Sequence, residues 1–181
     1  VGSAINDNDR ANMPSGMVRG FDARTLALKW TFHPMAGVNA GAGNAWSLLS
    51  TDSARDLVFL PTGSASPDFF GGLRPGDNRY ANSTVALRGS TGEVVWHFQT
   101  VHHDLWDYDV SAQPVLLTVK VNGTPRAAVA QATKMGHLFL LDRDTGKPLF
   151  PVEERNVPHS DIPEERASAT QPFPTVPPPI S

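Results

Sequence analysis

ALRGSTGEVVW (residues 86–96) is the stretch that decides the fold. It reads as a short strand, a tight turn that contains Gly, and a second strand that ends in a large aromatic ring. Two other stretches follow the same pattern, GFDARTLALKW (residues 20–30) and LLDRDTGKPLF (residues 140–150). In all three, a Thr precedes the closing aromatic residue by five positions. The pattern is therefore an internal structural repeat.

The spacing of the repeats predicts the architecture. They begin at residues 20, 86 and 140, which leaves room for four-stranded antiparallel blades with long inserted loops. Trp30, Trp96 and Phe150, the aromatic residues that close the repeats, are expected to pack between neighbouring blades. Because a propeller ring needs about four to eight blades, we expect about three blades of a larger propeller here.

The rest of the chain supports an all-β fold, since convincing amphipathic helices are hard to find. Six apolar runs bounded by Gly, Pro, Asn or Asp predict strands: DLVFLPTG (56–63), STVALRG (83–89), EVVWHFQ (93–99), QPVLLTVKV (113–121), AAVAQAT (127–133) and HLFLLD (137–142). Asn-Gly in VNGTP (residues 121–125) predicts a hairpin turn. We treat residues 1–181 as one partial propeller domain, with an extended Pro-rich segment over about residues 155–181.

Composition excludes several kinds of protein. The 181 residues carry a net charge of -3, so no basic surface argues for nucleic acid. No apolar run is long enough for a membrane span, and no signal peptide is visible. Cys is absent, which excludes disulfides, thiolate metal sites and Cys nucleophiles.

The stretch VHHDLWDYD (residues 101–109) is dense in titratable and aromatic residues. On a strand, Asp107 and Asp109 could share a face, whereas the adjacent His102 and His103 would point to opposite sides. A carboxylate beside Trp106 would be partly desolvated, which raises its pKa and suits a general base. The alternative is an Asx-turn with solvated carboxylates.

Three other features outside the repeat are candidates for a site. Trp46 lies among small residues in GAGNAWS, either as a core residue or as a platform for a flat ligand. Lys134 follows an apolar strand and either extends into solvent or faces an anionic ligand. Asp7 and Asn8 in INDND offer oxygen ligands to a hard cation, although acidic loops are common and EF-hand spacing is absent.

Several motifs together resemble one family. They are GMVRGFDARTLALKWTFHP, GNAWS, LPTGSASPDFFGG, RYANSTVAL, TGEVVWHFQTVHHDLWDYDVSAQP, KMGHLFLLDRDTG and TQPFP. In order and spacing they resemble the pyrroloquinoline-quinone (PQQ)-dependent quinoprotein dehydrogenases over nearly the whole chain. Within that family the resemblance is to the branch of membrane-bound quinoprotein glucose and quinate dehydrogenases.

The resemblance carries expectations about fold and function. It implies an eight-bladed β-propeller that holds PQQ near its axis together with a divalent cation, Ca²⁺ or Mg²⁺. It implies oxidation of an alcohol, polyol or aldose in the periplasm by hydride transfer to PQQ. The electrons would pass to ubiquinone or a cytochrome, and the remaining blades would come from outside this chain.

The resemblance also assigns roles to individual residues. Asp107 matches the catalytic base, the Asp that follows Trp in WDYD. Lys134 matches the cofactor-contacting Lys, and Trp46 matches the Trp that stacks on the PQQ ring. Trp106, next to the base, is assigned as a further cofactor contact.

The metal ligands are assigned in the same way, with one departure. Asp7 and Asn8 match an Asp-Asn pair of the glucose-dehydrogenase branch. The methanol-dehydrogenase branch has a ligating Asn just after TG, where this chain has Ser64 and, two residues on, Ser66. A hydroxyl is a weaker ligand than an amide oxygen, so the metal would depend on Asp7 and Asn8, with Ser66 as a further candidate.

Other roles stay open. His103, Asp104 and Asp109 are candidates for residues that orient the base or the substrate. A non-catalytic scaffold with PQQ-like repeats is the competing interpretation, although such scaffolds lack WDYD, the Trp outside the repeat and the Lys. A His/Asp metallohydrolase would need further ligands, which the spacing does not offer. We expect residues 1–181 alone to be inactive, because the ring would be open.

Overall fold

The computed structural model describes residues 1–6, 10 and 12–180. Within this part of the chain there are eleven strands and one short 3₁₀ helix, η1 (Gly71–Leu73). The strands are β1 (Val18–Phe21), β2 (Leu28–Phe32), β3 (Ser50–Asp52), β4 (Leu57–Pro61), β5 (Ser83–Arg88), β6 (Val94–Gln99), β7 (Val115–Val121), β8 (Thr124–Ala132), β9 (Leu138–Asp142), β10 (Val152–Asn156) and β11 (Thr170–Pro174). No helix among the described residues has the length and apolar character of a membrane span.

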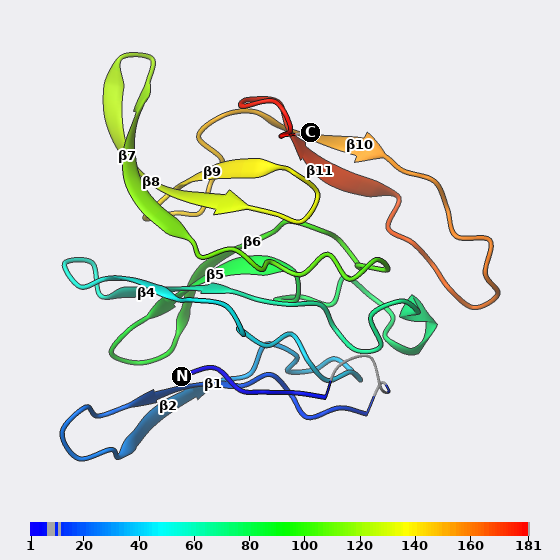
Figure 1. Cartoon of the computed structure of the whole chain (residues 1–181), viewed down its shortest axis with the longest axis horizontal. Helices are drawn as coiled ribbons and strands as arrows, with labels where there is room; N and C mark the ends of the chain where they lie inside the picture. The colour runs from blue at the N-terminus through cyan, green and yellow to red at the C-terminus, as the bar shows by residue number, and fades with distance from the viewer. Residues whose placement is uncertain (7–9, 11, 181) are drawn as a thin grey trace.

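The strands form antiparallel sheets that follow one another in chain order (Figure 1). β1 and β2 form a hairpin, β3 to β6 a complete four-stranded meander, β7 to β9 a three-stranded sheet, and β10 pairs with β11. In the third sheet an isolated bridge from Leu141 to Pro148 stands where a fourth strand would pair. The prediction of an all-β fold with antiparallel sheets is confirmed, and one sheet, β3 to β6, has the four strands expected of a blade. The six predicted apolar runs correspond to β4 to β9.

The turn between β7 and β8 confirms the predicted hairpin. Val121 pairs with Thr124, so only Asn122 and Gly123 lie between the strands. Both have positive φ, 49° and 80°, as the two central residues of a type I′ turn require.

The rings of the repeat reach from one sheet to the next. The indole N–H of Trp30, on β2, donates to the carbonyl of Gly89 at 2.8 Å, in the turn after β5. Trp96, on β6, donates in the same way to the carbonyl of Arg143 at 3.1 Å, in the turn after β9. The prediction of packing between blades is confirmed for these two residues. Phe150 is half-buried beyond the bridge that closes the third sheet.

The receiving turns are shaped for those rings. In all three repeats the residue after Thr has positive φ: 58° at Leu26, 77° at Gly92 and 69° at Gly146. Each donates its N–H to the carbonyl four residues earlier, at 2.7–2.8 Å. A Cβ atom on Gly92 would lie 2.6 Å from the Trp30 ring, and one on Gly146 would lie 2.4 Å from the Trp96 ring. Glycine is therefore required at these two turns both by backbone conformation and by space.

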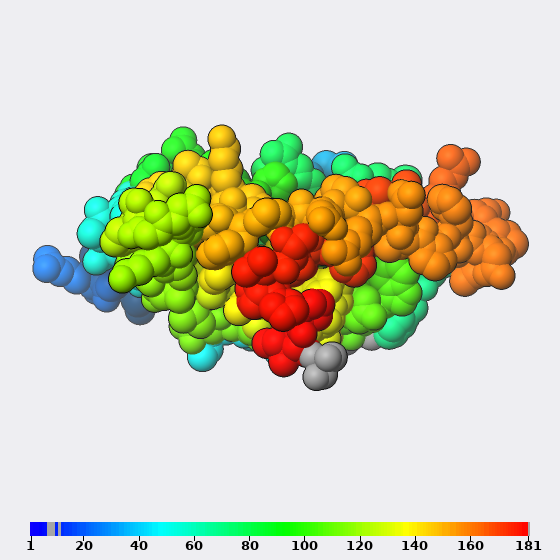
Figure 2. Space-filling view, turned by 90° about the horizontal axis from the view of Figure 1, so that it is seen from above, coloured from blue at the N-terminus to red at the C-terminus, as the bar shows by residue number. Residues whose placement is uncertain are grey.

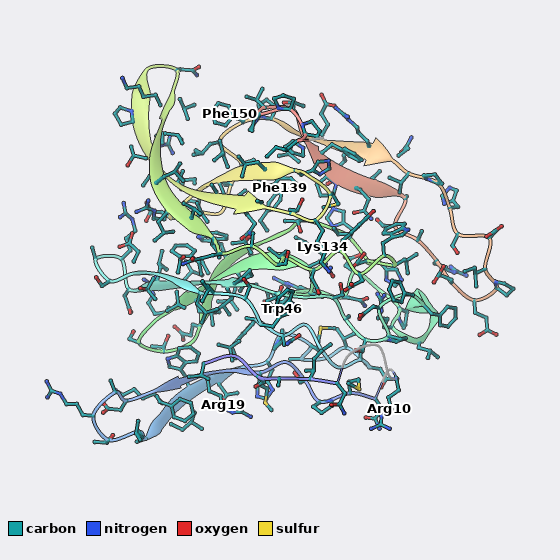
Figure 3. The ribbon with its side chains drawn as sticks, in the orientation of Figure 1. Arg10, Arg19, Trp46, Lys134, Phe139 and Phe150 are labelled. Carbon is teal, nitrogen blue, oxygen red and sulfur yellow. The ribbon has the colours of Figure 1, made fainter. Side chains whose placement is uncertain are left out.

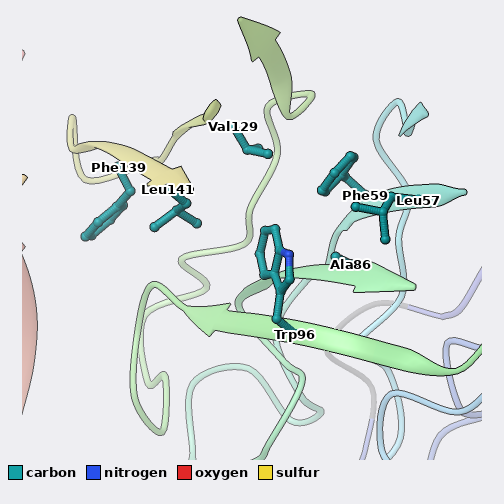
Figure 4. Packing of buried hydrophobic residues seen from close by; sticks show 7 residues of the cluster. All are labelled: Leu57, Phe59, Ala86, Trp96, Val129, Phe139 and Leu141. Atoms are coloured by element: carbon teal, nitrogen blue, oxygen red, sulfur yellow. The ribbon is translucent and has the colours of Figure 1, made fainter. Parts of the chain in front are cut away.

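The largest apolar contact between sheets surrounds Trp96 (Figure 4). This cluster consists of Leu57, Phe59, Ala86, Trp96, Val129, Phe139 and Leu141. Its members come from the four-stranded sheet and from the three-stranded sheet beside it, and the ring of Trp96 tilts against Phe59 at 5.7 Å. These contacts fix the two sheets to each other, and the loops at one end of both sheets carry the candidate site.

The C-terminal segment returns to the third sheet. β11 pairs with β10 over five residues, and Gln171 within it is buried. Farther on, the N–H of Ile180 donates to the carbonyl of Gly136 at 2.7 Å, in the turn between β8 and β9. In the space-filling view of Figure 2 the last described residues, in red, lie across the middle of the visible surface. The end of the segment therefore lies against the turn that carries Lys134.

Candidate functional site

The stretch 102–109 is a loop after β6, not a strand, so the alternation of faces expected for a strand does not apply. Two of its residues have positive φ, 44° at His103 and 58° at Asp107. A residue other than Gly in this conformation costs about 1–3 kcal/mol and persists only where surrounding contacts hold it. Of the ten described non-Gly residues with positive φ, Asp107 is the one that lines the pocket beside this loop.

A pocket of about 460 Å³ opens beside this loop. Four of the residues singled out from the sequence line it: Trp46, Asp107, Asp109 and Lys134. They come from the segment before β3, the loop after β6 and the turn between β8 and β9. Trp46 and Lys134 both lie in the middle of the view in Figure 3. Folding thus gathers residues from three distant parts of the chain.

Lys134 links the two carboxylates. Its ammonium group donates to the backbone carbonyl of Asp107 at 2.8 Å and to the Asp107 carboxylate at 3.1 Å. It also contacts the carboxylate of Asp109 at 3.4 Å. One cation therefore holds both acidic side chains at the wall of the pocket, and Lys134 is not a residue that merely extends into solvent.

The charged groups in this cluster shift one another's pKa values. Burial raises the pKa of Asp107 above its ordinary value, and the neighbouring Asp109 carboxylate raises it further, against the opposing effect of Lys134. Burial lowers the pKa of Lys134, but its contacts with the two carboxylates outweigh this, so that the pKa is raised. Asp107 is thus a stronger base than an ordinary Asp carboxylate, while Lys134 stays protonated.

Trp46 presents a flat apolar surface to the same pocket. Trp46 is 53% exposed, so it is not a core residue. Trp30 and Trp96, in contrast, are held between sheets by their indole hydrogen bonds. A core position for Trp46 is therefore excluded, and its ring offers a flat apolar surface at the pocket.

Asp104 is the buried member of the loop, with 1% exposure. Its carboxylate accepts the backbone N–H of Trp106 at 3.0 Å and that of Tyr108 at 2.7 Å. It also accepts the hydroxyl of Ser64 at 2.6 Å and the side-chain amide of Asn82 at 2.8 Å. The loop is thus an Asx-turn, as the sequence alternative proposed, but its capping carboxylate is buried rather than solvated.

Ser64 also contacts Asp109. Its backbone N–H donates to the Asp109 carboxylate at 2.6 Å, while its hydroxyl donates to Asp104. The side-chain oxygen also accepts from Asn82 at 2.9 Å. Ser64 lines the pocket, and its two donor groups link Asp104 and Asp109.

Besides Asp104, three of the predicted residues do not join this pocket wall. Trp106 stacks on Tyr108 at 5.8 Å and lines a separate apolar pocket of about 360 Å³ with Phe173. His103 is buried, and its Nδ1 contacts the carbonyl of Gly76 at 2.6 Å. Ser66 is fully buried, and its hydroxyl has no hydrogen-bond partner among the described residues.

The predicted metal ligands Asp7 and Asn8 lie outside the described residues. Over residues 1–6, 10 and 12–180, no group of three or more His, Cys, Asp or Glu side chains is arranged to hold a metal ion. Asn44, a pocket residue with only 5% exposure, directs its side-chain amide to the carbonyl of Ser3 at 3.1 Å. Its carbonyl oxygen is the kind of donor that a hard cation takes.

Sequence reasoning missed several residues that build the site. Asn44 and Asp68 line the pocket, and Asn82 reaches Asp104. Arg74 is completely buried and donates to the backbone carbonyl of Asp104 and, at 3.0 Å, to that of Pro67. The Asx-turn at Asp104 could be predicted locally, because an Asp side chain often accepts the backbone N–H two residues later. The contacts of Asn82 and Arg74 with Asp104 could not, because these residues are distant in the sequence.

Comparison with known proteins identifies the family. A family model described as "Glucose/ethanol/alcohol dehydrogenase, beta-propeller domain" matches residues 1–181. Quinoprotein glucose dehydrogenase A of Acinetobacter calcoaceticus is 41% identical over 96% of this chain and 24% of its own length. The quinate/shikimate dehydrogenase (quinone) of Acinetobacter baylyi is 41% identical over 95% of this chain and 23% of its own length.

A solved structure agrees with these sequence relatives. The quinohemoprotein alcohol dehydrogenase of Comamonas testosteroni superposes with a TM-score of 0.69 at 26% identity, over 90% of this chain and 28% of that one. The chain spans about a quarter of the length of the curated relatives it matches. It therefore belongs to the family of PQQ-dependent dehydrogenase β-propeller domains.

Proposed function

We propose that this chain carries the base and a cofactor-binding wall of a PQQ-dependent dehydrogenase that oxidises an alcohol, polyol or aldose. The observation that carries the proposal is the arrangement of Lys134 between Asp107 and Asp109 in a pocket that Trp46 also lines. A cation, a base and a flat apolar surface in one pocket match the needs of a flat anionic redox cofactor.

The residues of the pocket fit PQQ. The exposed face of Trp46 suits a flat ring system, and the ammonium of Lys134 suits its carboxylate and carbonyl oxygens. Within the propeller of the relatives the pocket would be completed by blades that this chain does not supply. PQQ would therefore rest on Trp46 and face Lys134.

When bound, PQQ would supply an ortho-quinone as the hydride acceptor. Asp107 removes the proton from the substrate hydroxyl, and its raised pKa makes it a better acceptor for that proton. Lys134 stays protonated and stabilises negative charge that develops beside it. Asp109 holds Lys134 from its other side and so keeps the cation next to the base.

The remaining parts of the proposal concern the whole protein. A divalent cation, Ca²⁺ or Mg²⁺, would depend on Asp7 and Asn8, with Asn44 as a further oxygen donor from the pocket wall. The protein would act in the periplasm and pass electrons to ubiquinone or a cytochrome. The other blades of an eight-bladed ring would complete the site.

The test uses the full-length protein that contains this chain, reconstituted with PQQ. We expect PQQ-dependent dye reduction with at least one substrate among glucose, quinate, glycerol and ethanol. Lys134→Ala should lower turnover about 100-fold, because a charged donor at the reacting centre is lost. Lys120→Ala, at an exposed position of β7, is the matched control and should keep full turnover.

Two results would contradict the proposal. One is the absence of PQQ-dependent reduction with every substrate of the panel when the protein binds PQQ. The other is equal turnover of the Lys134→Ala variant and the wild-type protein, which would make Lys134 a surface residue without a role in the reaction.

A further inference from the structure

We propose that Asp104 is a positioning residue, which sets the turn that carries Asp107 by holding the backbone N–H groups on both sides of it. The inference rests on the proposed function, because it concerns the same base. Asp104 lies too deep to touch a ligand in the pocket, since it is 1% exposed and is not part of the pocket wall. Its effect must therefore pass through its hydrogen bonds.

The geometry of the turn explains how this works. Asp107 has a φ of 58°, a left-handed conformation that Asp adopts less freely than glycine does. The carboxylate of Asp104 accepts the N–H of Trp106 at 3.0 Å and that of Tyr108 at 2.7 Å, so it holds the residues immediately before and after Asp107. With both neighbours fixed, the side chain of Asp107 leaves the turn in one direction, toward Lys134 and the pocket.

The carboxylate is itself held by the long loop between β4 and β5. Ser64 and Asn82, at the two ends of that loop, donate to the same oxygen of Asp104 at 2.6 Å and 2.8 Å. Arg74, in the middle of the loop, donates to the backbone carbonyl of Asp104. Donors thus surround Asp104, and the position of the base is tied to a segment that precedes it by tens of residues.

Ser64 extends the same function to the second carboxylate. Its hydroxyl donates to Asp104 and its backbone N–H donates to Asp109, which contacts Lys134. Ser64 therefore fixes the distance between the buried Asp104 and the Asp109–Lys134 pair. Its hydroxyl is committed to this bond, which makes it a positioning residue rather than a metal ligand.

Asp104→Asn in the full-length, PQQ-loaded protein tests the proposal. The variant keeps the size of the side chain but replaces one of its two accepting oxygens with an NH2 group, which cannot accept, whereas in the wild type one oxygen accepts from Tyr108, Ser64 and Asn82. We expect kcat to fall about 100-fold, as a small misplacement of a reacting group does, while KM changes less than about twofold. Hydrogen–deuterium exchange in peptides over residues 103–110 should become faster.

A double variant separates position from charge. Asp104→Asn with Asn82→Asp restores the buried negative charge but moves it away from the amides of Trp106 and Tyr108. We expect kcat to stay low in this variant. Recovery of wild-type kcat would overturn the inference. It would mean that kcat depends on the buried negative charge and not on the hydrogen bonds from the N–H groups of Trp106 and Tyr108.

Two matched controls report on structure alone. Asp52→Asn alters a half-buried carboxylate, which accepts from Arg55 and Arg143 at 3.1 Å, on the edge strand β3. Ser83→Ala removes another buried hydroxyl, which donates to the carbonyl of Ala81 at 2.7 Å. Both should lower thermal stability and leave kcat, KM and exchange over residues 103–110 unchanged.

Ser64→Ala is the milder variant and decides the matter if Asp104→Asn does not fold. It removes one donor from Asp104 but keeps both amides, so we expect kcat to fall about fivefold at constant KM. An unchanged kcat in either variant, in an active wild-type background, would overturn the inference. A wild-type protein without PQQ-dependent activity would contradict the proposed function alone; unchanged exchange over residues 103–110 in Asp104→Asn would then overturn the inference.

Discussion

The turn of the third repeat and the loop that carries the base begin alike and then diverge. Asp142 accepts the N–H of the residue two positions later at 3.2 Å, and Asp104 does the same at 3.0 Å. Each chain segment then enters the left-handed region, at Gly146 with a φ of 69° and at Asp107 with a φ of 58°. The repeat has a residue that adopts this conformation freely, whereas the loop has one that does not.

The difference separates a structural turn from a functional one. In the repeat, the residue without a side chain leaves space for the ring of Trp96 from the neighbouring sheet. In the loop, the side chain at the strained position is the one that reaches the pocket. The hydrogen bonds from the N–H groups of Trp106 and Tyr108 to Asp104 hold the backbone on both sides of Asp107. They offset the cost of its left-handed conformation and so fix the direction of its carboxylate.

The largest expected effect comes from the chemistry of the loop itself. Asp107→Asn in the full-length protein should lower kcat about 1,000-fold, because an amide cannot take the substrate proton, while PQQ stays bound. Dye reduction and the absorbance of the bound cofactor measure the two quantities. Asp144→Asn, at an exposed carboxylate of the repeat turn, is the control and should keep wild-type kcat. Near-normal turnover of the Asp107→Asn variant would remove the base from this loop.

The next effect tests the repeat turn. Gly146→Ala should lower the free energy of unfolding by about 3 kcal/mol, since the new Cβ would meet the Trp96 ring at 2.4 Å in a left-handed backbone. Gly123→Ala shares the positive φ but has nothing within 4 Å of the new Cβ, so it should cost only about 1 kcal/mol. Thermal or denaturant unfolding measures both. Equal losses would show that backbone strain alone, and not the ring, selects glycine.

The smallest effect concerns the cap of the same turn. Burial raises the pKa of Asp142, but its bonds with Arg126, Thr145 and Asp144 outweigh this, so that the pKa lies below its ordinary value. Such a group adds stability above its unfolded pKa, and that stability is lost as the pH falls through the folded pKa.

Asp142→Ala should therefore lower the free energy of unfolding by about 1 kcal/mol at pH 7. The difference from wild type should shrink as the pH falls below about 4 in a series of unfolding measurements. Asp144→Ala, where the side chain is 58% exposed, should cost less than about 0.5 kcal/mol. A loss at Asp142 that does not change with pH would mean that the carboxylate charge has no part in the cap.

Local features of the fold could be predicted from the sequence, and distant contacts could not. Alternation of apolar residues and the Asn-Gly dipeptide act over a few residues, so β4 to β9 and the β7–β8 turn were predictable. The contact of Lys134 with Asp107 spans 27 residues, and the family resemblance, which assigned Lys134 to the cofactor, did not predict it. The bonds from Ser64 and Asn82 to Asp104 span 40 and 22 residues, and no local pattern encodes them.

The placement of two predicted residues could not be derived from the sequence. Trp106 was assigned to the cofactor because it is adjacent to Asp107, but its ring lines a different pocket from the one that Asp107 lines. Ser66 was a further candidate for the metal, but it is fully buried and does not line that pocket. In both cases the orientation of the side chain, which a sequence does not give, decides which pocket the residue reaches.

The contacts of Trp30 and Trp96 run in one direction only, from each sheet to the one that follows it. The four-stranded sheet therefore has two unlike sides, one that receives a ring in the glycine turn after β5 and one that offers a ring from β6. A junction between unlike sides can be repeated head to tail without creating a new kind of contact. The junctions on both sides of this sheet are thus compatible with gene duplication as the source of the repeat.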